Sequence, residues 1–298
     1  MKKNFFLSLC AAVMGLSGCI KLDKSSGCLN GSFSVAEGKY VRFSRGNLQY
    51  TWSTQTWSFA KNQYDIIGTD NVTGGTVELS AKNGNGDSKI GRASADKIDL
   101  FSWSGSTGVA KWGLSFLDYY GDFLDDDGNY YGGDFVDWGQ NAIRNGGNKA
   151  NQWRTLTADE WEYLINDRPN ASSLLGVASV NGVNGLVLLP DGWKQPNGVS
   201  FKSGFASKCG GVASYGDCQT FTLYRWNKLE KSGAVFLPAS GVRLGLFVSY
   251  VGCSSNYRSA TSNDEYTACH LIFFPTEAKM IDYTRSGGLA VRLVQDVK

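Results

Sequence analysis

Residues that commonly carry nucleophilic or metal chemistry are few in this chain of 298 residues, which has one histidine, His270, and seven cysteines. No two cysteines have C-x-x-C spacing, so a zinc site is not expected. With one histidine and no nearby candidate base, a Ser/His or Cys/His nucleophile is hard to build. Paired carboxylates such as Asp159 and Glu162 are expected to be solvated. We therefore predict no catalytic residues, no metal site and no enzymatic activity.

An acidic run at residues 125–129 (DDDGN) raises the question of calcium. Alternating oxygen ligands around a glycine turn suit a hard cation. The run lacks the D-x-[DN]-x-[DN]-G spacing of an EF-hand, and no glutamate stands at the closing position. A water-exposed acidic turn explains it equally well. We predict no cofactor and leave calcium open as the alternative.

The first 19 residues carry targeting information. Lys2 and Lys3 precede an apolar stretch at residues 5–16, which is too short to span a bilayer. The sequence LSGC at 16–19 resembles a bacterial lipobox, and that resemblance implies cleavage before Cys19 and lipidation of this cysteine. The alternative is an ordinary signal peptide with an incidental cysteine. We predict a signal peptide at 1–18, a lipid anchor and tether at 19–32, and an outer-membrane or cell-surface location.

Residues 33–298 are expected to form one domain with no transmembrane helix. A net charge of +2 provides no bulk attraction for nucleic acid. The content of 37 glycines and 9 tryptophans with only 5 prolines is typical of a loop-rich domain with aromatic packing. Export permits disulfides, and Cys209–Cys218 and Cys253–Cys269 are possible pairs that would leave Cys28 free.

The element expected at the centre of the domain is a helix within residues 153–168 (WRTLTADEWEYLINDR). Thr157 and Glu160 have the spacing of a capping box. Trp161, Leu164 and Ile165 follow at i, i+3 and i+4, which predicts one buried stripe. Trp138, in the preceding segment, is expected to pack beneath this helix.

The same stretch resembles the W-R-L-P-T-E-A-E-W-E-Y signature of the C-type-lectin-like fold of the formylglycine-generating-enzyme and sulfatase-modifying-factor type. The proline is missing and Thr155 is inserted, a departure that points to a distant branch, the bacterial lipoproteins that reuse this fold. Residues 99–103 (DLFSW) and 285–294 (RSGGLAVRLV) are similar to other sequence motifs of that family. The resemblance implies an α+β fold, loop-rich, with short antiparallel strands and a few short helices.

Two activities found among relatives of this fold are not expected here. The related enzymes bind copper through a closely spaced cysteine pair, whereas Cys253 and Cys269 lie sixteen residues apart. Sugar-binding lectins carry E-P-N or Q-P-D and then W-N-D, whereas this chain has QPN at 195–197 and Lys228 after Trp226-Asn227. Calcium-dependent sugar binding is therefore disfavoured.

The segment 241–274 is where we expect a ligand to bind. The positions that resemble the scaffold of this family, among them Gly241, Arg243, Gly252, Ala268 and Leu271, should be buried or form turns. Between them lie residues of both polar and apolar type, and their side chains should share one solvent-facing surface. The predicted ligand-binding residues are Leu244, Leu246, Phe247, Ser249, Tyr250, Ser255, Asn256, Arg258, Asn263 and Thr267. Arg258 stands where the family often has tryptophan, and we expect it to be open to solvent because an unpaired buried charge is costly.

The same segment resembles the variable proteins of diversity-generating retroelements, which randomise this surface by adenine mutagenesis. Mutated AAC codons become NNC codons, which never encode Trp, Met, Lys, Gln or Glu. Residues 238–264 contain none of these five types, although the chain has 45 of them in 298 and about four would be expected. The alternative is an ordinary loop-strand-loop rich in Ser, Gly and Tyr.

Together these features predict a cell-surface lipoprotein that displays a ligand-binding face on a C-type-lectin-like scaffold. Its partners would be an unknown protein or glycan outside the cell and the membrane, through the lipid anchor, but not nucleic acid. A structural or adhesive lipoprotein without a diversified face is the alternative, followed by an enzyme related to sulfatase-modifying factors.

Overall fold

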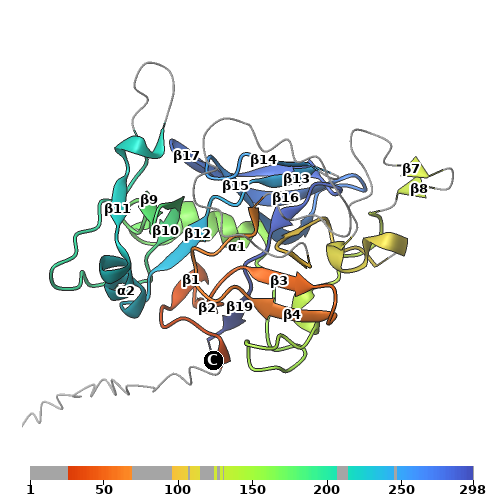
Figure 1. Ribbon diagram of the computed structural model, residues 1–298, viewed down its shortest axis with the longest axis horizontal. Helices are drawn as coiled ribbons and strands as arrows, with labels where there is room; N and C mark the ends of the chain where they lie inside the picture. The colour runs from red at the N-terminus through yellow and green to blue at the C-terminus, as the bar shows by residue number, and fades with distance from the viewer. Residues whose placement is uncertain are drawn as a thin grey trace, which may run out of the picture.

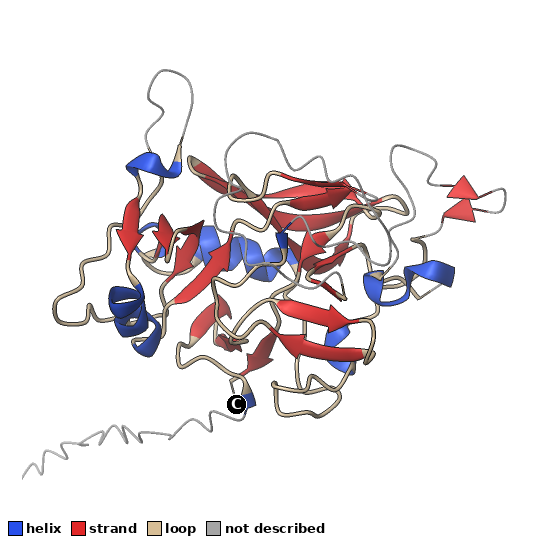
Figure 2. Cartoon of the chain, in the orientation of Figure 1, coloured by secondary structure: helices blue, strands red, loops and turns tan. Residues whose placement is uncertain are grey.

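The computed structural model describes residues 26–68, 96–106, 108–114, 124–125, 128–129, 131–206, 214–244 and 247–297 (Figure 1). Strands outnumber helices, and long loops join them (Figure 2). This arrangement confirms the coarse prediction of a loop-rich α+β domain. Within the described ranges, no helix combines the length and the apolar character needed to cross a bilayer.

A three-stranded sheet holds the two ends of the described chain together. It has the order β1-β2-β19 and is antiparallel throughout. Its strands are β1 (Phe33–Ala36), β2 (Lys39–Phe43) and β19 (Val294–Asp296). The pairing of Val294 with Phe43 places the C-terminal strand beside the first residues of the domain. Both ends consequently lie at the lower edge of the molecule in Figure 1.

A four-stranded sheet of order β11-β9-β10-β12 forms the second layer. Its strands are β9 (Leu175–Val180), β10 (Val183–Leu188), β11 (Gln219–Phe221) and β12 (Val235–Pro238), and helix α2 (Leu223–Lys231) follows β11. The two apolar runs GLVLLP and GAVFLP form the adjacent antiparallel strands β10 and β12, with Leu186 opposite Leu237. Strand β11 is parallel to β9, which departs from the predicted antiparallel pattern.

A five-stranded sheet of order β17-β16-β15-β18-β6 forms the C-terminal part. Its strands are β6 (Leu100–Phe101), β15 (Ser255–Ser262), β16 (Thr267–Phe274), β17 (Glu277–Thr284) and β18 (Leu289–Ala290). The hairpin of β13 (Val242–Leu244) and β14 (Phe247–Ser249) precedes it in the chain. Strand β15 is the middle strand, so neighbouring elements surround it on both edges.

A smaller aromatic core lies among β3 (Leu48–Thr51), β4 (Thr56–Phe59), β5 (Lys97–Ile98) and the 3-10 helices η4 (Gly108–Gly113) and η5 (Trp138–Gln140). Among the described strands, β7 (Leu124–Asp125) and β8 (Gly128–Asn129) pair only with each other, and they lie at the right edge of the molecule in Figure 1. Trp138 is fully buried in this core, with its ring 5.4 Å from that of Phe135 and 6.1 Å from that of Phe101. The prediction that Trp138 packs beneath the central helix was therefore wrong, because the helix belongs to the larger core.

The central helix begins where the sequence predicted. Helix α1 (Ala158–Glu162) continues as the π-helix η6 (Tyr163–Asp167), in which the Arg168 amide donates to the Tyr163 carbonyl at 2.8 Å. Thr157 and Glu160 form the predicted capping box. Trp161, Leu164 and Ile165 are all buried, which confirms the stripe. Short 3-10 turns η7 (Ala171–Ser173) and η8 (Tyr215–Asp217) complete the described helices.

Candidate functional site

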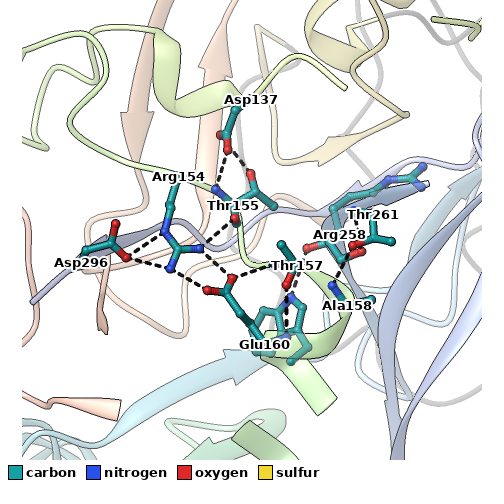
Figure 3. A network of polar contacts seen from close by, with 11 residues as sticks. Asp137, Arg154, Thr155, Thr157, Ala158, Glu160, Arg258, Thr261 and Asp296 are labelled. Atoms are coloured by element: carbon teal, nitrogen blue, oxygen red, sulfur yellow. Dashed lines mark hydrogen bonds and ion pairs between the residues drawn. The ribbon is translucent and has the colours of Figure 1, made fainter. Parts of the chain in front are cut away.

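The start of the central helix ties three distant parts of the chain together (Figure 3). Arg154 donates to Glu160 at 2.7 and 2.8 Å and to Asp296 at 2.7 and 2.9 Å. Although burial opposes its charge, the hydrogen bonds to these two carboxylates raise the pKa of Arg154. The Ala158 amide donates to the Thr261 hydroxyl at 3.0 Å, which joins the helix to β15. This network holds the helix against both β19 and the C-terminal sheet.

Trp161 connects the helix to the segment that we predicted to bind a ligand. Its ring lies 5.9 Å from Phe43 and 6.4 Å from Tyr257, and its indole nitrogen donates to the Arg258 carbonyl at 3.3 Å. Tyr257 and Leu271 point to the same large core. One face of β15 and β16 is therefore a packed interior face, which excludes it from contact with a ligand.

The scaffold positions of the segment behave as predicted. Arg243, Ala268 and Leu271 are buried. Gly241 and Gly252 have φ of +77° and +76°, which is the left-handed region that favours glycine. A Cβ atom at Gly241 would lie 2.3 Å from the Ser249 carbonyl oxygen, so no larger residue fits there. These residues fix the path of the backbone around the β13–β14 hairpin.

The hairpin carries part of the predicted surface. Leu244 pairs with Phe247 and Val242 pairs with Ser249, so these four positions share one face of the two strands. Leu244 and Ser249 are half-buried, and Tyr250, which follows β14, is 52% exposed. Leu246 and the side chain of Phe247 lie outside the described part of the chain. The described members are thus accessible in part, but only Tyr250 is fully on the surface.

The prediction failed along β15. Ser255, Asn256 and Arg258 are buried, with Arg258 only 1% exposed. The expectation that position 258 must be open to solvent was therefore wrong. The reason is that β15 is the middle strand of its sheet and that main-chain carbonyls receive the guanidinium. Arg258 donates to the carbonyls of Phe101, Arg285 and Gly287, the first two at 3.4 and 3.2 Å.

Arg258 belongs to a layer of three buried arginines with Arg243 and Arg285, here called the arginine layer. Arg243 donates to the Leu100 carbonyl at 3.2 Å, and Arg285 donates to the Tyr131 carbonyl at 3.1 Å while lying 5.0 Å over the ring of Trp103. Burial lowers the pKa of Arg258 to about 9; Tyr283 opposes this shift, whereas the charges of the other two arginines reinforce it. The layer clamps loop backbones on the side of the sheet opposite Trp161.

His270 lies within the same layer, opposite Arg258 in the register of β15 and β16. Its Nε2 atom is 3.0 Å from Asn256 Oδ1, and its ring lies 5.6 Å from Tyr283. Burial, reinforced by the charge of Arg258, lowers the pKa of His270 to about 3. The histidine is therefore neutral near pH 7 and acts as a packed, hydrogen-bonded side chain, not as an exposed acid or base.

The turn between β15 and β16 supplies the other predicted positions. Asn263 is exposed and Thr267 is half-buried, and the Asn263 side chain donates to the Thr267 hydroxyl at 3.1 Å. Asp264 accepts from the amides of Tyr266 and Thr267 at 2.8 and 2.6 Å, and these bonds lower the pKa of its carboxyl. Tyr266 is 44% exposed and was missed by the sequence analysis. The turn residues Asn263 and Asp264 before it were the available signal.

The described cysteines are all free thiols: Cys28, Cys218, Cys253 and Cys269. The possible pair Cys253–Cys269 is thus not formed, and Cys269 instead donates to Asp282 at 3.0 Å. Cys209 lies outside the described residues, as does Cys19, the predicted site of lipidation. In the parts of the chain that the structure describes, no three His, Cys, Asp or Glu side chains gather as a metal would require. Asp126 and Asp127 of the acidic run fall outside those parts.

The predicted tether is shorter than expected. Within 19–32, the described residues from Ser26 pack on the domain, where Leu29 is buried and its amide donates to the Phe43 carbonyl at 2.9 Å. The Cys28 thiol donates to Gln295 at 3.0 Å. The domain therefore begins before residue 33.

Comparison of the chain with family models, with curated proteins and with solved structures found no match.

Proposed function

We propose that this chain is a cell-surface lipoprotein that displays a ligand-binding face on a C-type-lectin-like scaffold of the sulfatase-modifying-factor type. The scaffold part rests on the resemblance of residues 153–168 and 285–294 and on the α+β architecture. The lipoprotein part rests on the lipobox-like sequence ending at Cys19. The ligand would be a protein or glycan outside the cell, and the chain would not act as an enzyme.

One observation carries the display function. The described chain starts at the lower edge of the molecule, whereas the β13–β14 hairpin and strands β15, β16 and β17 lie along the opposite, upper side (Figure 1). A chain anchored through Cys19 would therefore hold its membrane-proximal end at β1, β2 and β19. The C-terminal sheet would point away from the membrane, toward a partner.

The proposed face is narrower than the sequence predicted. It keeps the accessible positions Leu244, Ser249 and Tyr250, which precede β15, and Asn263 and Thr267 around the turn at the far end of β15, where it gains Tyr266. It loses Ser255, Asn256 and Arg258, because buried side chains cannot contact a ligand without opening the sheet. Tyrosine, serine and asparagine on a rigid support suit recognition of varied partners, since a tyrosine provides a large contact area with few rotatable bonds.

Anchoring and display are tested together in intact cells. An epitope inserted after Asp264 should be stained by antibody on intact cells, and a fatty-acid probe should label the protein. Cys19→Ala should abolish the label and release the chain from the membrane. Staining that appears only after permeabilisation, at equal expression, would contradict display outside the cell. Equal labelling of Cys19→Ala would contradict the anchor.

Ligand binding is tested with the fluorescently labelled chain on a glycan array and on immobilised extracellular matrix proteins. Tyr250→Ala and Tyr266→Ala should each reduce any specific signal at least about fivefold. Tyr224→Ala is the matched control, because Tyr224 is 70% exposed on α2, outside the proposed face. Equal loss in all three variants would show that the C-terminal sheet is not the binding face.

A structural or adhesive lipoprotein without a diversified face is the second candidate. The burial of Ser255, Asn256 and Arg258 favours it, because randomised codons at buried positions would often destabilise the sheet. The DNA flanking the gene separates the two candidates. A reverse-transcriptase gene with a near-repeat of the coding segment for 241–294 would support diversification, and its absence from the locus would favour the second candidate.

A further inference from the structure

A cavity of about 450 Å³ opens where the N-terminal segment joins the domain. Four chain segments form its walls: the first described residues, the loop after β2, the turn after β4 and the C-terminal end of α2. Its lining residues are Gly27, Cys28, Leu29, Asn30, Arg45, Lys61, Asn62, Glu230 and Lys231. The volume is in the range of cavities that hold small ligands.

The charges around this cavity favour an anion. Three lining residues are cationic, namely Arg45, Lys61 and Lys231, and only Glu230 is anionic. Glu230 already accepts a hydrogen bond from Gln63 at 3.0 Å, which engages part of its carboxylate. Cys28 does not oppose an anion, because burial raises the pKa of its thiol to about 11 and the thiol stays neutral.

The three cationic side chains differ in how far they are exposed to solvent. Arg45 is half-buried and donates to the Lys61 carbonyl at 3.1 Å, so its guanidinium is held at the cavity wall. The Nε atom of Arg45 is buried and has no hydrogen-bond partner in the structure. Lys61 and Lys231 are exposed. One guanidinium held at the wall with two exposed ammonium groups is an arrangement that suits a phosphate, which accepts several charge-assisted hydrogen bonds.

The covalent chain sets a limit on how far this cavity can lie from the lipid. Gly27 lines the cavity, and the backbone from Cys19 to Gly27, at no more than about 3.5 Å per residue, spans about 30 Å or less. Negatively charged headgroups attract basic side chains that lie close to a membrane surface. A lipid on Cys19 would therefore keep the cavity within about 30 Å of the membrane and allow it to approach such headgroups.

We propose that this cavity binds the phosphate of an anionic phospholipid headgroup in the membrane that holds the lipid anchor. The proposal rests on the lipoprotein function proposed above. Arg45, Lys61 and Lys231 would contact the phosphate. Binding there would fix the orientation of the domain, with the membrane-proximal end down and the C-terminal sheet outward.

The test measures binding of soluble short-chain lipids to the full chain carrying Cys19→Ala, which cannot be acylated. The probes are dihexanoyl phosphatidylglycerol, dihexanoyl phosphatidylcholine and inorganic phosphate, each followed by calorimetry at low salt. Phosphatidylglycerol should bind at least about tenfold more tightly than phosphatidylcholine. Inorganic phosphate binding as tightly as phosphatidylglycerol would overturn the headgroup assignment in favour of free phosphate.

Paired variants assign the binding to the cavity. Lys61→Gln with Lys231→Gln should weaken phosphatidylglycerol binding at least about tenfold. Lys149→Gln with Lys194→Gln removes the same charge from exposed positions outside the cavity lining and should change binding less than about twofold. Equal effects of the two pairs, or no effect of the first, would overturn the proposal. Both pairs retain the N-terminal apolar stretch, so its affinity for lipid does not enter the comparison.

Failure of this proposal is distinguishable from failure of the anchor. If fatty-acid labelling shows that Cys19 is acylated but the cavity lysines do not control lipid binding, the anchor stands and the cavity proposal falls. If Cys19 takes no label but Lys61 and Lys231 still control phosphatidylglycerol binding, the anchor falls and the anionic-lipid site stands.

Discussion

The helix region at 153–168 and the strand region at 255–258 lie back to back, joined by the bond from Trp161 to the Arg258 carbonyl. Trp161 and Arg258 are both buried, yet the sequence predicted burial for Trp161 alone. Trp161 is apolar and lies on a regular stripe, whereas Arg258 is charged and was expected in solvent. The structure buries Arg258 as completely as its apolar neighbours.

The difference shows how a charged residue can serve as a core residue. The carbonyls of Phe101, Arg285 and Gly287 converge on Nε and Nη2 of the Arg258 guanidinium and replace part of the water that it loses, whereas its Nη1 is buried without a hydrogen-bond partner among the described residues. A charge needs compensation when it is buried, and backbone carbonyls can provide part of it without a carboxylate. An arginine in a variable-looking segment is therefore weak evidence for an exposed surface.

The largest expected effect lies on the helix side of the comparison. Trp161→Ala should lower the free energy of unfolding by about 3–5 kcal/mol, because it leaves a cavity in the main core. Chemical denaturation measures this change. Tyr250→Ala, at an exposed turn, should change it by less than about 0.5 kcal/mol. A similar loss in both variants would contradict the division between core and face.

A substitution in strand β15 should lower the unfolding free energy almost as much. Arg258→Ala should cost about 3 kcal/mol, because buried carbonyls lose their donor. Arg225→Ala, at an exposed position on α2, is the control and should change stability by less than about 0.5 kcal/mol. If denaturant titrations show that Arg258→Ala lowers the unfolding free energy no more than Arg225→Ala does, position 258 is exposed to solvent and belongs to the proposed face.

The neutral His270 predicts a pH dependence. Its pKa is lowered to about 3 in the folded protein, below the ordinary value of 6.5. Below pH 6.5 the unfolded chain takes up a proton that the folded chain does not, so stability should fall as the pH drops toward 3. Well below pH 6.5, the slope should approach about 1.4 kcal/mol per pH unit.

The measurement is the difference in unfolding free energy between the unmodified chain and His270→Gln from pH 7 to pH 4. Taking the difference removes the carboxylates common to both proteins. The amount by which the unfolding free energy of the unmodified chain exceeds that of His270→Gln should decrease steadily as the pH falls below 6.5. A difference that stays constant over this range would mean that His270 titrates normally and is reached by water.

The smallest expected effect compares two helix starts. Thr157→Ala should cost about 1 kcal/mol, because the Thr157 hydroxyl accepts from the Glu160 amide at 3.2 Å. Thr222 occupies the same position before α2 but makes no side-chain capping bond, so Thr222→Ala should have almost no effect. Thermal melts of the two variants test this difference, and equal shifts would contradict the role of the capping box.

The sequence correctly predicted features whose interacting residues lie close together in the chain. It failed for features whose interacting residues lie far apart in the chain. Gly241 and Gly252 were expected from the family resemblance to be buried or to form turns, and both adopt the positive φ that favours glycine. The predicted ligand-binding residues between these glycines and after them were expected to share one exposed surface, although β15, which carries three of them, runs through the middle of a sheet. Sequence period identifies which residues share a face, but it does not tell which faces the rest of the chain covers.

The amino-acid sequence by itself determined the start of the central helix and its buried stripe, because a capping box and a stripe at i, i+3 and i+4 involve only neighbouring residues. Only the tertiary structure decided that Arg258 is buried and that Tyr266 is exposed. The physical reason is that Nε and Nη2 of Arg258 donate to carbonyls of residues 101, 285 and 287, which come together only when the five-stranded sheet forms.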